Sequence, residues 1–123
     1  PERAIRTERY KYIRRFHEQA RPQPLSNLDD GLSKSVWYEA EYATRLQPQA
    51  ALYDLLFDPM EQDNLIESKP HAAIVTTLAE RLDRWMTQTA DPLRDGHVPL
   101  PPGAFANLDS DYSAKDALTR ERG

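Results

Sequence analysis

One long amphipathic pattern most limits how this chain can fold. Between residues 74 and 86, apolar side chains recur at steps of three and four residues, the spacing that lines one face of a helix. These side chains are Ile74, Val75, Leu78, Leu82, Trp85 and Met86. Ser68 or Lys69 can cap such a helix, with Pro70 in its first turn. The helix is predicted to end near Ala90, because Pro92 disfavours helical backbone at the residue before it.

Short stretches that favour β structure supply a layer against which this helix can pack. Arg3 to Thr7 and Tyr10 to Phe16, separated by Glu8-Arg9, predict a β-hairpin or one long bent strand. Ala51 to Phe57 predicts a further strand, which Asp58-Pro59 ends. The predicted fold class is therefore α+β, with a small antiparallel sheet packed against the long helix and a second helix, and with an extended Pro-rich tail.

The remaining segments predict a loop, a second helix and a tail. His17 to Gly31 is rich in Pro, Asn and Asp, which predicts a loop. Lys34 to Leu46 predicts a helix, with Ser33 as its N-cap and an apolar stripe facing a core. The stripe consists of Leu32, Val36, Ala40, Ala43 and Leu46. We expect one α+β domain over residues 1–103 and an extended, Pro-rich tail over residues 104–123.

Charge is distributed unevenly along the chain. The net charge is −4, yet seven basic and only three acidic residues lie within the first 22 positions. Tyr10, Tyr12 and Phe16 interleave with these cations, a combination that can bind single-stranded nucleic acid or an anionic polysaccharide. The other interpretation is that the cations are solvated or paired with the acidic remainder. We favour it, because a negative net charge opposes binding that depends on counterion release.

Several classes of site are excluded by the residues that the chain lacks. It has no cysteine, which excludes disulfide scaffolds, thiolate metal sites and cysteine nucleophiles. His17, His71 and His97 show no spacing typical of zinc ligands or of a catalytic triad. No apolar run approaches the roughly 20 residues of a membrane span. We therefore predict no catalytic, cofactor-binding or metal-binding residue and no membrane partner.

Three segments carry a resemblance to a known family. Arg3 to Phe16 reads RAIRTERYKYIRRF, and Leu52 to Leu65 matches L-Y-D-L-x-x-D-P-x-E-x-x-N-L at all nine fixed positions. Leu78 to Leu93 contains W-M-x-x-T-x-D-P, and Gly96 to Pro101 follows as G-x-V-P-x-P. Together they resemble the C-terminal domain of type I, formylglycine-dependent sulfatases. The most similar branch is that of heparan N-sulfatase (N-sulfoglucosamine sulfohydrolase).

The resemblance implies a parent enzyme that hydrolyses a sulfate ester or sulfamate of a carbohydrate. That parent would use Ca²⁺ and formylglycine in an N-terminal catalytic domain, against which this smaller domain would pack. Periplasmic, lysosomal or extracellular localisation is implied as well. Because the chain begins at Pro1, we expect it to be a piece of this parent and inactive alone. We also expect it to expose an apolar patch where the larger domain sat, and to bury that patch by self-association or in a lattice. A degenerate, non-catalytic relative is a further alternative.

Two segments are similar to catalytic motifs of the family but do not match them. A weaker hypothesis concerns residues that contact substrate. Ser68-Lys69-Pro70-His71-Ala72 has Ala where the formylglycine motif C/S-x-P-x-R requires Arg. Asp29-Asp30-Gly31 is similar to a Ca²⁺-binding aspartate pair, but it lies in a polar loop before a helix. The hypothesis is that His17 and Arg21, in the long loop after the hairpin, overhang the parent's cleft and contact substrate.

Overall fold

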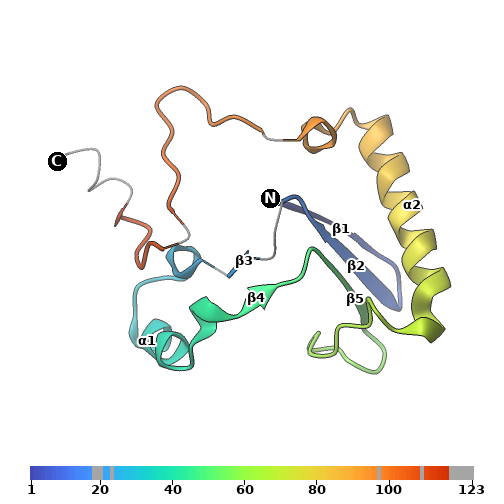
Figure 1. The fold of residues 1–123 in the computed structure, drawn as a ribbon, viewed down its shortest axis with the longest axis horizontal. Helices are drawn as coiled ribbons and strands as arrows, with labels where there is room; N and C mark the ends of the chain where they lie inside the picture. The colour runs from blue at the N-terminus through green and yellow to red at the C-terminus, as the bar shows by residue number, and fades with distance from the viewer. Residues whose placement is uncertain (18–20, 23, 97, 109, 117–123) are drawn as a thin grey trace. The chain divides into compact units, whose positions relative to one another are not determined.

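The predicted long helix is present as α2, Ala72–Gln88, in a computed structural model that describes residues 1–17, 21–22, 24–96, 98–108 and 110–116 (Figure 1). A 3₁₀ turn at Lys69–His71, with Pro70 in it, precedes the helix. Ser68 stands before this turn but makes no capping bond to the backbone. The helix ends close to the predicted position, where Ala90 adopts a left-handed backbone at φ 48°.

The chain divides into two units. The first combines Pro1–Gln19 with Pro48–Val98, and the second combines Ala20–Gln47 with Pro99–Gly123. The first unit contains a three-stranded antiparallel sheet in the order β1-β2-β5, together with α2 (Figure 1). Its strands are β1 at Glu2–Arg6, β2 at Tyr10–Arg15 and β5 at Ala50–Asp54. The α+β fold class and the hairpin are thus confirmed.

The core of the first unit lies between the sheet and α2. Tyr12 of β2 and Leu52 of β5 stand directly opposite each other in the antiparallel register. Both belong to one buried apolar cluster, whose other members come from α2 and the turn after it. These members are Leu78, Leu82, Met86 and Leu93. The predicted stripe of α2 therefore faces the sheet, and Trp85 is half-exposed at its margin.

The second unit is built from short elements. Its two-stranded antiparallel ribbon pairs β3, Arg21–Pro22, with β4, Leu46–Gln47. Helix α1 spans Leu32–Glu39, and 3₁₀ turns lie at Leu25–Asn27 and Tyr42–Thr44. No helix in the described part of the chain has the length and apolar content needed to cross a membrane.

The helix predicted over Lys34 to Leu46 is wrong at its C-terminal end. It is interrupted by Glu41, whose backbone is left-handed at φ 55°, and a 3₁₀ turn and β4 follow. Ser33 is not the N-cap, since Gly31 occupies that position. The predicted inward stripe is also wrong, because Leu32, Val36 and Leu46 are exposed.

Two other boundaries differ from those predicted. The strand predicted to reach Phe57 ends at Asp54, whose carbonyl accepts hydrogen bonds from Phe57 N and Asp58 N and so starts a turn. The predicted loop from His17 to Gly31 contains β3 and a 3₁₀ turn. Pairing with β4 orders β3 within that loop, which local composition alone does not indicate.

Candidate functional site

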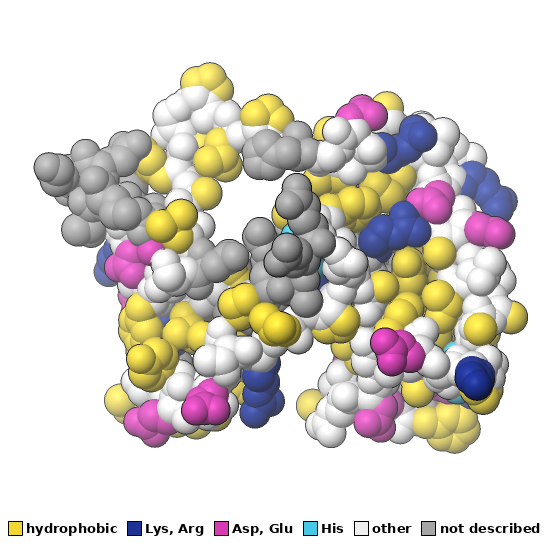
Figure 2. Space-filling view, viewed as in Figure 1, with side chains coloured by type: hydrophobic (Ala, Val, Ile, Leu, Met, Phe, Trp, Pro, Cys, Tyr) yellow, Lys and Arg dark blue, Asp and Glu magenta, His cyan; other side chains and the backbone are white. Residues whose placement is uncertain are grey.

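The hairpin cations are paired with acidic side chains. Five cations of the hairpin form ion pairs, four of them with residues far along the chain. The pairs are Arg3–Asp91, Arg9–Asp54, Lys11–Glu61, Arg14–Asp83 and Arg15–Glu2. Figure 2 shows basic and acidic side chains interleaved over this unit rather than gathered by sign. The interpretation that the cations pair with the acidic remainder is the one that the structure supports.

Asp54, the third residue of the 52–65 motif, joins the hairpin turn to β5. It is only 5% exposed and accepts bonds from Arg9 Nε at 3.0 Å and Arg9 Nη2 at 2.7 Å. Its Oδ1 also lies 3.3 Å from Leu56 N, the start of the following turn. The Arg9 guanidinium lies 5.0 Å from the Tyr10 ring and 5.3 Å from the Phe57 ring. Two segments 45 residues apart are thereby held together.

Asp91 of the W-M-x-x-T-x-D-P segment likewise joins two distant segments, at the end of α2. It is buried and receives Arg3 Nε at 2.6 Å and Arg3 Nη2 at 3.2 Å. Its Oδ1 also accepts from Leu93 N at 3.0 Å, which caps the 3₁₀ turn at Pro92–Asp95. Asp91 therefore fixes β1 to the chain that follows α2.

Asn64 and Leu65 close the outer edge of β5. Asn64 Oδ1 accepts hydrogen bonds from Leu52 N at 3.0 Å and Ile66 N at 3.1 Å, and its Nδ2 donates to Ala50 O at 3.4 Å. Leu65 N donates to Leu52 O at 2.8 Å. The fixed polar residues of the motif thus satisfy backbone groups that an edge strand would leave open. Their chemistry here is structural.

Asp54 and Asp91 make the stability of the fold depend on pH. Hydrogen bonds from Arg9 and Arg3, respectively, hold the pKa of each carboxyl below its ordinary value of 3.8. A carboxyl whose pKa is lower in the folded chain stabilises the fold above its unfolded pKa, and this contribution is lost as pH falls through the folded pKa.

We therefore expect the free energy of unfolding to lose the contribution of these two pairs only below about pH 4. Urea unfolding measured from pH 7 to pH 2 checks this. Asp54→Asn should lower stability at neutral pH and should reduce the further loss in acid. If the free energy of unfolding fell equally steeply below pH 4 in Asp54→Asn and in the unmodified chain, the assignment would be contradicted.

Residues of the rejected catalytic and metal motifs form hydrogen bonds with other side chains. Ser68 Oγ shares a hydrogen bond of 2.8 Å with His71 Nδ1, across the turn that begins α2. Asp30 Oδ1 accepts from Lys34 Nζ at 2.8 Å, and Asp30 Oδ2 accepts from Ser113 Oγ at 2.7 Å. Within the described ranges, no group of three or more His, Cys, Asp or Glu side chains could hold a metal ion.

His17 falls in the first unit and Arg21 in the second. His17 is half-buried, and neither ring nitrogen has a hydrogen-bond partner among the described residues. Its carbonyl accepts from Gln49 Nε2 at 2.9 Å. The backbone of Arg21 pairs with Gln47 in the ribbon, while its side chain lies outside the described part of the structure. Their contact with substrate stays a prediction.

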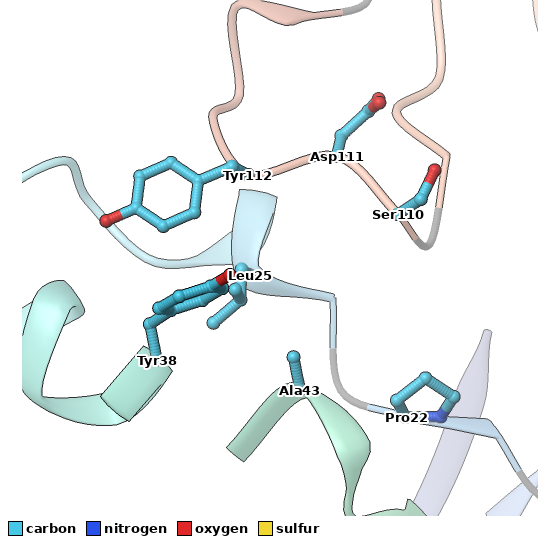
Figure 3. A pocket seen from close by; sticks show the side chains of 7 residues that line it. All are labelled: Pro22, Leu25, Tyr38, Ala43, Ser110, Asp111 and Tyr112. Carbon is cyan, nitrogen blue, oxygen red and sulfur yellow. The ribbon is translucent and has the colours of Figure 1, made fainter. Parts of the chain in front are cut away.

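A pocket that the sequence did not indicate lies in the second unit (Figure 3). Its volume is about 510 Å³. The lining residues are Pro22, Leu25, Tyr38, Ala43, Ser110, Asp111 and Tyr112. Tyr38, at the end of α1, meets Tyr112 edge to face, with ring centroids 5.7 Å apart. Asp111 Oδ2 accepts a hydrogen bond from Leu108 N at 2.7 Å, and most of the other lining side chains are apolar.

Comparison with known proteins relates the chain to a sulfatase. No family model matches it. It is similar to the Ulvan-active sulfatase of Formosa agariphila, with 32% identity over 106 residues. The match covers 82% of this chain and 20% of the relative, so the chain spans about a fifth of the length of this relative. The similarity supports a sulfatase-derived domain, in agreement with the three motif segments.

Proposed function

We propose that this chain is the C-terminal domain of a formylglycine-dependent sulfatase of the heparan N-sulfatase branch. Similarity to a sulfatase over 82% of the chain carries the proposal. The 52–65 motif supports it, because Asp54 binds Arg9 of the hairpin turn and Asn64 holds the motif's loop against β5. The full-length parent hydrolyses a sulfate ester or sulfamate of a carbohydrate, and this domain completes its fold.

The proposal places the catalytic groups in a separate domain of the parent. Ser68 is tied to His71 and is followed, at the position of the required Arg, by Ala72. The described residues contain no carboxylate cluster suited to Ca²⁺. The residues described here therefore do not fit the formylglycine or the Ca²⁺ site, and no chemical step is assigned to them.

The coding sequence upstream of Pro1 tests this assignment. We expect it to contain a C/S-x-P-x-R motif and a pair of aspartates suited to Ca²⁺, in one reading frame with this chain. A separate reading frame, or an upstream domain with neither feature, would refute the proposal. In that case a degenerate relative of the family would be the better description.

Within this proposal, His17 and Arg21 border the substrate cleft of the parent. The half-buried His17 ring, without a partner among the described residues, is the observation that favours it. In the full-length polypeptide, His17→Ala and Arg21→Ala are expected to raise KM for an oligosaccharide substrate several-fold and to leave kcat for a small aryl sulfate unchanged. Arg45→Ala, at an exposed site of the second unit, serves as the control. Unaltered KM in both variants would remove the hypothesis.

A further inference from the structure

Helix α1 buries a lysine and exposes apolar residues. Lys34 is 1% exposed, whereas Leu32 is 90% exposed and Val36 is 64% exposed. With 3.6 residues per turn, Leu32, Val36 and Ala40 lie on one side of the helix, and Lys34 lies on the opposite side. We call these three residues the α1 stripe. Figure 2 shows apolar side chains at the surface over this helix.

A polar cluster fixes this orientation. Lys34 Nζ donates to Asp30 Oδ1 at 2.8 Å and to Leu28 O at 3.2 Å, and it lies 4.5 Å from the Tyr112 ring centroid. Ser113 Oγ holds the other oxygen of Asp30. Rotation of the helix to bury the stripe would break the contacts of Lys34 with Asp30, Leu28 and Tyr112. Contacts within the second unit therefore hold the stripe in its exposed orientation.

Such a stripe is suited to a protein partner. Burial of one exposed Leu or Val side chain contributes about 1.5–3 kcal/mol to association before its costs are subtracted. Exposed polar residues, Ser33, Ser35 and Glu39, surround the stripe. An apolar centre with a polar rim is the usual arrangement of a specific interface.

We propose that the α1 stripe docks on the part of the parent polypeptide that precedes this domain. This inference rests on the proposed function and names the surface that joins the two parts. The matched relative supports this occupant, because this chain corresponds to only 20% of its length. In that relative, the remaining four-fifths belong to the same polypeptide. A corresponding partner would be present in a one-to-one ratio with this domain.

Thiol labelling of the full-length polypeptide tests the docking. This chain has no cysteine, so Val36→Cys places a new thiol in the stripe, and Arg45→Cys places one at an exposed position outside the stripe and its polar rim as the control. We expect the thiol from Val36→Cys to react with maleimide about tenfold more slowly, because labelling requires local opening of the interface. Leu32→Cys is the second variant. Equal rates for stripe and control positions would overturn the proposal.

A short cross-linker attached to the Val36→Cys thiol identifies what covers the stripe. Capture of a residue upstream of Pro1 in the same polypeptide is the expected result. Capture of a second copy, or of another part of residues 1–123, would overturn the proposal. Aryl sulfatase activity is measured on the same sample: a shielded stripe without turnover refutes the proposed function alone, and turnover with equal labelling rates refutes the docking alone.

Discussion

Replacement of Leu52 by alanine is expected to destabilise the chain by about 2–5 kcal/mol. Leu52 is 0% exposed, lies opposite Tyr12 in the sheet and belongs to the cluster buried beneath α2. The smaller side chain would leave a cavity that the strand and the helix can fill only in part. Urea denaturation checks this, with a lower midpoint and an unchanged m value.

Leu56→Ala is the matched control for that experiment. It changes the same residue type within the same motif, but Leu56 is 65% exposed. Its effect should stay within about 0.5 kcal/mol. An equal loss in both variants would show that the motif does not stabilise the fold through the buried cluster.

Replacement of Asn64 by alanine is expected to cost about 1–3 kcal/mol, because the buried Leu52 N would lose its acceptor. Asn64→Asp keeps the acceptor oxygens and loses only the long bond to Ala50 O, so it should cost less. Gln62→Ala, at an exposed neighbouring position, is the control. The same denaturation experiment compares them, and a loss for Asn64→Asp as large as that for Asn64→Ala would contradict the assigned bonds.

Local patterns predicted the first unit well. The hairpin was predictable because β-favourable residues flank a two-residue turn, and α2 because its stripe repeats over four turns. Asp54 and Asn64 could be singled out from the sequence, because they occupy fixed positions of the 52–65 motif. Their contacts could not be predicted, because Arg9 lies 45 residues from Asp54 and no local pattern indicates such a pairing.

The second unit was predicted poorly for a physical reason. Helical periodicity shows that apolar residues share a face, but it does not show whether that face is buried within the same unit. Here Lys34 is held by Asp30 and by the ring of Tyr112, far along the sequence, so the expected orientation of α1 is reversed. The pocket between Tyr38 and Tyr112 arises from the same distant contact.

We propose that this chain is one domain of a sulfatase whose catalytic domain lies elsewhere in the same polypeptide. Hydrolysis of an aryl sulfate, measured with Ca²⁺ present, tests it most directly when the full-length polypeptide and residues 1–123 are compared. We expect turnover by the full-length polypeptide and none by residues 1–123. Turnover at enzyme-like rates by residues 1–123, or its absence from the full-length polypeptide, would contradict it.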